Sequence, residues 1–252
     1  MAGPVEPARR EPIWLRPERP EKPQRGPQPA YTRSEIVAAA VAIADREGVE
    51  AMTMRKVATA IGAGTMSVYR YVPSKQDLYD LMVDTVWSEL AIPDTPGDWR
   101  PELSTLAAEL RVAAHRHPWA VSVGLSGWGF GPGFLRCFEF ALSALDGLGM
   151  PVSRMVEAVQ LLVIFVEAFV TNELRDAELA RETGMSEQQR WMARIPYVQQ
   201  VVASGRYPMF ARLLTEGDHV NAELQFTRGV DRVLDGIEAG IAQETSPPGP
   251  GR

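Results

Sequence analysis

Apolar side chains recur at intervals of three and four residues along most of the chain, which is the spacing of an amphipathic helix. In the first such stretch, TRSEIVAAAVAIADREG, they are Ile36, Val37, Ala40, Val41 and Ala44. Thr32 with Glu35 three residues later forms a capping box, and Gly48 supplies a stop. The pattern therefore predicts a helix from residue 33 to residue 47.

Several further helical segments follow. Thr53 caps a short helix, MRKVATAI, which ends at Gly62, and a second short helix runs from Gly64 to Val72. Later helices are predicted after Ser74, Asp98, Pro132, Pro151 and Ser186, and near His219. No segment shows the strict alternation of a half-buried strand, so the expected fold class is all-α.

The ends of the chain differ from this pattern. Residues 1–30 carry eight prolines, which remove amide donors and disfavour helix, so we expect a disordered arm rich in proline and arginine. This arm is either a plain tail or a segment that contacts DNA. Residues 245–252 form a second disordered tail. Between the tails we expect two domains: one with two short helices at 31–85, which we call the reader, and a larger helical domain at 86–244.

Composition places the protein in the cytoplasm. The chain has 252 residues, 45% of them hydrophobic and 23% charged, which is ordinary for a soluble globular protein. The single cysteine, Cys137, forms no intramolecular disulfide and suits a reducing compartment. The apolar stretch Leu161–Val170 is interrupted by Glu167 and is short for a membrane span, so we expect no membrane partner. The net charge of −6 is only a weak argument against nucleic acid, because phosphate binding needs a local basic face.

Two short helices joined by Gly62-Ala63-Gly64 and braced by longer helices form a helix-turn-helix pattern, whose second helix enters the major groove. Val57, Ala58 and Ile61 give the first helix a core face, and Val68 and Val72 give the second one. The residues expected to face outward are Thr65, Met66, Ser67, Tyr69, Arg70 and Tyr71. Arg55, Lys56 and Lys75, in first turns of helices, suit phosphates. The alternative is a compact helical subdomain without a DNA partner.

The stretch from Glu35 to Asp84, including the run Tyr69-Arg70-Tyr71-Val72-Pro73-Ser74-Lys75, resembles the N-terminal domain of the tetracycline-repressor (TetR) family. The resemblance implies a homodimer that binds double-stranded operator DNA and responds to a small-molecule effector. It also implies that Tyr69 and Lys75 grip phosphates, while Met54, Arg55 and Thr65 to Ser67 approach bases. Gly64 departs from the family, because many relatives carry a DNA-reading side chain there.

The C-terminal part resembles the tetracycline-repressor-like regulatory domain through AHRHPWAVSV and FTRGVDRVLDGIEAGI. The resemblance implies that Pro151–Leu174 and Asn221–Ala242 are the dimerisation helices. The first of these is apolar nearly all round from Leu161 to Val170, so it must be buried on several sides. A dimer interface and a buried core helix of a monomer both satisfy that requirement.

Aromatic residues with a few polar groups form the candidate ligand site. The predicted ligand-binding residues are Trp128, Phe134, Phe138, Gln160, Phe165, Glu167 and Phe169. Core packing is the alternative for each aromatic ring. We expect no metal and no cofactor, because the three histidines lack ligand-like spacing and Ser122 stands where tetracycline-binding relatives place a metal-coordinating histidine.

An enzyme would need a nucleophile with a base, paired carboxylates or a metal set, and the sequence shows none of these patterns. The sequence therefore predicts a DNA-binding transcriptional regulator, a repressor that a small, largely apolar ligand releases from its operator. A dimeric DNA-binding protein that needs no ligand is the remaining alternative.

Overall fold

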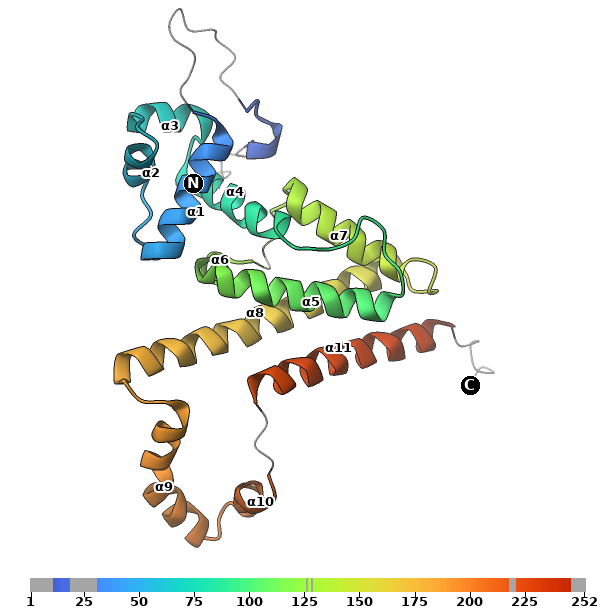
Figure 1. The fold of residues 1–252 in the computed structure, drawn as a ribbon. Coiled ribbons are helices and arrows are strands. Elements are labelled where there is room, and N and C mark those ends of the chain that lie inside the picture. Colours follow the sequence, from blue (N-terminus) through green and yellow to red (C-terminus); the bar gives the residue numbers. More distant parts are fainter. Residues whose placement is uncertain (1–10, 19–30, 126, 128, 218–220, 246–252) are drawn as a thin grey trace, which may run out of the picture. The chain divides into compact units, whose positions relative to one another are not determined.

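The computed structural model describes residues 11–18, 31–125, 127, 129–217 and 221–245 (Figure 1). Within these residues every regular element is a helix, so the predicted all-α fold is confirmed. The chain divides into two compact units, Met1–Gly147 and Leu148–Arg252.

The first unit holds a short 3-10 helix and seven α-helices. They are η1 (Ile13–Leu15), α1 (Arg33–Glu47), α2 (Met54–Ala60), α3 (Thr65–Tyr71), α4 (Lys75–Ser88), α5 (Trp99–Arg116), α6 (Pro118–Val123) and α7 (Pro132–Leu145). Helix α4 is central, because it packs against α1 on one side and against α5, α6 and α7 on the others. The short helix α6 was not predicted from the sequence. Pro118 opens it as a new helix.

Local signals set the helix ends of the reader as predicted. Thr32 and Glu35 form the capping box of α1, and Gly48 ends that helix. The Thr53 hydroxyl accepts a hydrogen bond from the Lys56 amide at the start of α2. The Ser74 hydroxyl accepts one from the Asp77 amide at the start of α4. These contacts satisfy amides that have no partner inside the helix, which is why such short helices can begin there.

The compact units do not divide at the predicted boundary near residue 85. Leu78, Met82 and Val86 form a fully buried stripe on α4, spaced four residues apart. This helix packs both against α1 and against α7, so helices α1–α3 share a core with α5–α7. The division falls instead after Gly147, at the turn between α7 and the next helix.

Part of the N-terminal arm is folded, contrary to the prediction of a disordered segment over residues 1–30. Residues 11–18 include η1, and the side chain of Ile13 is only 1% exposed. Ile13 is buried and Trp14 is partly buried, so these two side chains supply apolar contacts that the flanking prolines lack. The predictions for residues 1–10, 19–30 and 246–252 fall outside the described residues.

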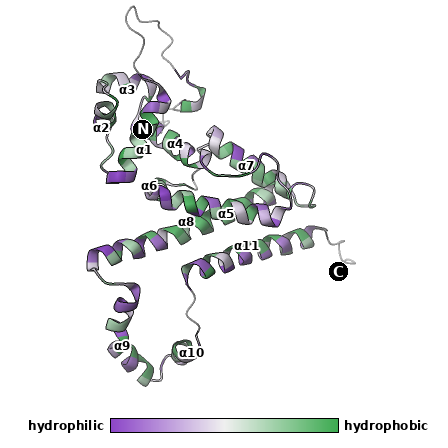
Figure 2. Cartoon of the chain, viewed as in Figure 1, coloured by the Kyte–Doolittle hydropathy of each residue, from purple (hydrophilic) through white to green (hydrophobic). Residues whose placement is uncertain are grey.

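The second unit consists of α8 (Val152–Thr183), α9 (Glu187–Ala203), α10 (Pro208–Glu216) and α11 (Ala222–Thr245). Helix α8 packs along α11, and α10 packs against α9. Figure 2 shows that the C-terminal end of α8 is polar and its middle more apolar. Helix α8 continues nine residues beyond its predicted end at Leu174, and α10 was not predicted.

Phenylalanine rings fill the contact between α8 and α11. The rings of Phe165 and Phe169 lie 6.0 and 5.2 Å from that of Phe226, which is buried. A methyl group on Gly229 would lie 2.3 Å from the ring of Phe165, so glycine is required for this close approach. The two helices are thus held together by an aromatic cluster around a glycine.

The length of α8 corrects one argument made from the sequence. Its 32 residues make it long and apolar enough to cross a membrane by length and composition alone, although a buried helix of a soluble protein passes the same test. The shortness of the apolar stretch therefore does not by itself exclude a membrane span.

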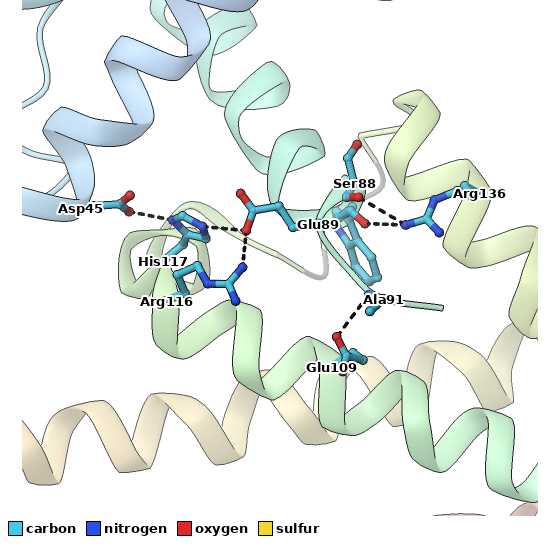
Figure 3. Close-up of polar contacts among 9 residues, drawn as sticks. Asp45, Ser88, Glu89, Ala91, Glu109, Arg116, His117 and Arg136 are labelled. Carbon is cyan, nitrogen blue, oxygen red and sulfur yellow. Dashed lines mark hydrogen bonds and ion pairs between the residues drawn. The ribbon is translucent and has the colours of Figure 1, made fainter. Parts of the chain in front are cut away.

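A polar cluster joins α1 to α4 and to the corner between α5 and α6 (Figure 3). The two ring nitrogens of His117 lie 2.8 Å from a carboxylate oxygen of Asp45 and 3.1 Å from one of Glu89. Trp119 also donates to Asp45, and Arg116 donates to Glu89. We call these five residues the corner clamp.

Burial of Glu89 acts to raise the pKa of its carboxyl, but the hydrogen bonds from His117 and Arg116 outweigh this effect and hold the pKa below its ordinary value. The ionised form of Glu89 is therefore the one that the folded state favours. Its contribution to stability is present at neutral pH and is lost as the pH falls through that lowered pKa.

The corner clamp predicts a stability effect. His117→Ala removes a donor from each of two carboxylates, and we expect the free energy of unfolding to fall by about 1–3 kcal/mol at neutral pH. Thermal unfolding followed by circular dichroism measures this change. Ser104→Ala, on the exposed side of α5, is the control and should change stability by less than about 0.5 kcal/mol. An equal effect of both substitutions would contradict the role of the clamp.

Candidate functional site

The helix-turn-helix of the reader is built on a small buried core. Val57 of α2 and Val68 of α3 are fully buried, as is Val72 just after α3. Gly62 has φ +67°, a left-handed conformation that glycine adopts without strain, and it lets the chain turn between the two helices. The predicted core residues Val57, Ala58, Val68 and Val72 are buried, whereas Ile61 is only partly buried.

The structure corrects two of the predicted DNA-contacting residues. Tyr71 is only 5% exposed, and its ring packs edge-on against that of Tyr31, 5.4 Å away. Met54 is 6% exposed. Tyr71 lies three residues after Val68, so it falls on the same buried face of α3. Neither side chain is available to a base or a phosphate, and sequence analysis was wrong to place Tyr71 outward.

The remaining predicted residues form one exposed face, which we call the reading face. Met66, Tyr69 and Arg70 are spaced three and four residues apart on α3, and all three are exposed. Met66 is 76% exposed, which is unusual for a large apolar side chain. Thr65 and Ser67 are partly exposed beside it. The face therefore combines an apolar group, hydroxyls and a cation, the groups that contact base edges and phosphates.

Cations border the reading face in different electrostatic settings. Arg55 and Lys75 are exposed, and the Lys75 ammonium lies 5.2 Å from the centre of the Tyr79 ring. Lys56 instead pairs with Glu47, with 2.8 Å between the ammonium and a carboxylate oxygen. Hydrogen bonds from Lys56 and from Arg46 hold the pKa of Glu47 below its ordinary value. Lys56 must therefore leave a carboxylate to meet a phosphate.

A cavity of about 180 Å³ lies in the first unit, beside α4. Trp87 and Phe134 provide aromatic walls, with their ring centres 5.5 Å apart. Gln76 and Asp80 provide polar groups from the first half of α4, and Gln76 donates to Asp80 over 3.1 Å. The rest of the lining comes from Val83, Asp84, Val123, Gly124, Gly127 and Gly129.

Asp84 ties this cavity to α7. Its carboxylate accepts the amides of Gly133 and Phe134, over 3.2 and 2.9 Å, at the first turn of α7. Burial raises the pKa of the Asp84 carboxyl above its ordinary value, and the two backbone hydrogen bonds counter this only in part. The arrangement caps α7 with a side chain from α4, so the two helices are held at one point.

The predicted ligand-binding aromatics fall into two clusters, one in each unit. Phe134 lines the cavity, and Phe138 stacks on it with ring centres 5.4 Å apart. Phe165 and Phe169 belong to the cluster between α8 and α11, where packing accounts for them without a ligand. The prediction for Trp128 falls outside the described residues.

The two predicted polar ligand residues lie on α8. Gln160 is exposed, and Glu167 is partly exposed. A carboxylate among apolar neighbours needs a partner or water, and because Glu167 is partly exposed, water reaches it. Their role toward a ligand stays a prediction.

Sequence analysis missed the polar wall of the cavity. Asp84 stands within the apolar run LMVDTVW, and an acidic residue at such a position signals a buried partner. Glycines alternate from Gly127 to Gly133 and signal a close approach of other groups to the backbone. Both signals were available, but they do not reveal that the two segments meet.

A second, open hollow of about 360 Å³ lies between α8 and α11 in the second unit. Arg154, Glu157 and Leu161 of α8 border it, and Gly236 and Gly240 of α11 face it across the gap. A methyl group on Gly236 would meet no atom within 4 Å. The backbone of α11 is therefore uncovered in this hollow.

The Cys137 thiol and the arrangement of possible metal ligands bear on the enzyme alternative. Burial raises the pKa of the Cys137 thiol to about 11, so the thiol is protonated at neutral pH and is a poor nucleophile. Across the part of the chain that the structure describes, no group of three or more histidine, cysteine or acidic side chains is arranged to hold a metal ion.

Relatives of known family share both parts of the chain. Residues 36–82 match the family model described as bacterial regulatory proteins, tetR family. Residues 92–241 match the model described as tetracyclin repressor-like, C-terminal domain. The chain is 38% identical over 224 residues to the HTH-type transcriptional repressor DrrR1 of Streptomyces coeruleorubidus, covering 88% of this chain and 83% of that protein. It is 37% identical to an HTH-type transcriptional regulator of Saccharopolyspora erythraea, over 54% of this chain and 57% of the relative.

Solved structures share the fold. Apo ActR from Streptomyces coelicolor superposes with a TM-score of 0.72 at 23% identity, over 86% of this chain and 99% of ActR. ActR in complex with actinorhodin gives a TM-score of 0.70 over 84% of this chain and 98% of ActR. The two family models and the identity to DrrR1 over most of both chains lead to one conclusion: this chain is a member of the TetR family of transcriptional regulators.

Proposed function

We propose that the protein is a repressor that binds operator DNA through the reading face as a homodimer and leaves it when a small ligand binds. The observation that carries the proposal is the exposed set Met66, Tyr69 and Arg70 on α3, flanked by the exposed cations Arg55 and Lys75. Met66 places a large apolar side chain in water beside hydroxyls and a cation, and this combination suits contact with base edges and phosphates. The repressor activity named for the relative DrrR1 supports the same function.

The first prediction separates phosphate contacts from base contacts. Lys75→Ala should weaken binding to operator and to random duplex alike and reduce the slope of log affinity against log salt by about one unit. Arg70→Ala or Ser67→Ala should instead cost about 1–3 kcal/mol on operator alone. Fluorescence anisotropy at several salt concentrations, on an operator selected from random duplexes, measures both effects. Arg181→Ala, an exposed arginine of α8, is the control. If none of the three reader variants changed DNA affinity, the proposed DNA contacts would be refuted.

The homodimer part of the proposal rests on the open side of α8 and α11. Leu161 and Ile164 on α8 are 53% and 46% exposed, and Gly236 and Gly240 leave the α11 backbone uncovered. A helix of a second copy would bury the leucine and approach the glycines closely, as small residues permit. This interface would also cover the long apolar α8 in a soluble, cytoplasmic protein without a membrane.

Two substitutions test the dimer without disturbing the fold of the single chain. Leu161→Asp places a charge on an exposed site, and Gly236→Leu fills open space. Both should convert dimers to monomers in sedimentation velocity, since an unpaired charge or a bulky group would be buried in the interface. Val112→Asp, equally exposed on α5, should leave the dimer intact. A dimer that survives both changes would place the interface elsewhere.

The ligand part of the proposal rests on the cavity beside α4. Its volume of about 180 Å³ is below the roughly 300–1,000 Å³ typical of sites for drug-sized ligands. We propose that it receives one ring of an aromatic ligand against Trp87 and Phe134, with Gln76 and Asp80 facing a polar substituent. The ligand complexes of ActR, a protein of the same fold, support a sensor role for the family fold.

A thermal-shift screen of planar aromatic compounds, with and without an amine group, tests the cavity. A compound at about 100 times its Kd should add about 2.7 kcal/mol to stability, a shift of several degrees in Tm. Val83→Phe fills the cavity and should abolish the shift, while Leu135→Phe, exposed on α7, should retain it. A binder that also releases operator is an inducer. If no binder is found, or if binding survives Val83→Phe, this cavity is not the sensor site.

We do not expect catalysis, because Cys137 is protonated and belongs to the core. The alternative function is a dimeric DNA-binding protein that needs no ligand, and the packing of Phe165 and Phe169 favours it for the second unit. The thermal-shift screen distinguishes the two functions.

A further inference from the structure

The folded part of the N-terminal arm, residues 11–18, is anchored at three points in the first unit. Ile13 is buried, at 1% exposure. The indole nitrogen of Trp14 donates to the carbonyl of Gly129 over 2.8 Å. The guanidinium of Arg33, the first residue of α1, donates to the carbonyl of Pro17 over 2.8 Å. These residues precede the family match, which begins at residue 36.

The Trp14 anchor has a shaped seat. A methyl group on Gly131 would lie 2.6 Å from the Trp14 ring and closer still to the carboxylate of Asp84. Only glycine therefore lets the indole and the Asp84 carboxylate both approach the backbone at this position. The same loop continues into α7, whose first amides bind Asp84.

This seat is also the rim of the cavity. Gly127 and Gly129 line the cavity on one side, and Asp84 and Phe134 line it on another. The Trp14 indole donates a hydrogen bond to the carbonyl of Gly129. Any change in the position of Gly129 therefore acts on the Trp14 hydrogen bond.

The other end of the arm is held by the reader. Arg33 donates to two successive carbonyls, those of Pro17 and, at 3.4 Å, Arg16. Arg33 opens α1, and α1 packs against α2, the first helix of the helix-turn-helix. The arm thus contacts the glycine-rich segment at the cavity through Trp14. Three residues later, Pro17 accepts the hydrogen bond from Arg33 in the first turn of α1.

We propose that residues 11–18 act as a strap that couples the reader to the rim of the cavity, with Trp14 as the positioning residue. The inference rests on the proposed function, since it links operator binding to the ligand site. Because the strap is anchored on both elements, a displacement of one element is transmitted to the other. By thermodynamic reciprocity, if the position of Gly129 affects DNA affinity, then DNA bound at the reader affects the stability of the backbone at Gly129.

Hydrogen exchange of the full-length protein, with and without a selected operator duplex, tests the strap and needs no known ligand. In the wild type, operator binding should slow exchange in peptides covering residues 124–134, on the order of fivefold. In Trp14→Ala this response should be lost, while the reader peptides over α2 and α3 remain protected by DNA. Trp14→Phe keeps a ring in the seat but removes the hydrogen bond, and it should restore part of the response. Trp191→Ala, at an exposed tryptophan of α9, should respond as the wild type does.

The outcomes separate the strap from the function on which it rests. If the wild type protects no reader peptide with any duplex, the proposed function fails and the strap fails with it. If DNA protects the reader but the loop does not respond, or responds equally in Trp14→Ala, the strap alone is refuted. Should Trp14→Ala unfold, the same comparison is made with Trp14→Phe and with Arg33→Met, which removes the other anchor.

Discussion

In the first unit, the packing of α7 and of its preceding loop against α4 depends on the carboxylate of Asp84. A buried carboxylate is tolerated only with hydrogen-bond donors, and here the donors are the first amides of α7. Those amides can reach it only because Gly131 and Gly133 carry no side chain, since a methyl group at either position would collide with α4. One ionisable group therefore fixes where α7 begins, what the preceding loop contains and where the indole of Trp14 can rest.

The same helix, α4, explains why the reader is not an independent module. Its buried stripe packs against α1 and α7 together, and its C-terminal end joins the corner clamp through Glu89. His117 reaches from the α5–α6 corner to Asp45 of α1, so the corner touches the reader directly as well as through α4. A displacement of α5, α6 or α7 thus has more than one route to the DNA-reading helices, and the arm adds a third.

Local chemistry made much of the fold predictable. The capping box of Thr32 and Glu35, the caps at Thr53 and Ser74, and the valines of α2 and α3 depend on residues a few positions apart. The reading face could be predicted less well. Tyr71 has a polar tip that suggested exposure, yet its ring fills the core beside Tyr31, because α3 has no other large residue for that face. Contacts such as Trp14 with Gly129, 115 residues apart, follow from tertiary structure and leave no local signal.

The pairing of Lys56 with Glu47 bears on how the protein would search a genome. A free lysine that meets a phosphate displaces a condensed cation from the duplex, which makes sequence-independent binding weaken steeply with salt. Lys56 must give up its ion pair with Glu47 to do so, and the loss of that pair offsets part of the gain from releasing the cation. On the proposed function, Lys56 would therefore add less to sequence-independent binding than the exposed Lys75. Compared with a free lysine at position 56, this would shorten the time that the protein spends on DNA whose sequence it does not recognise.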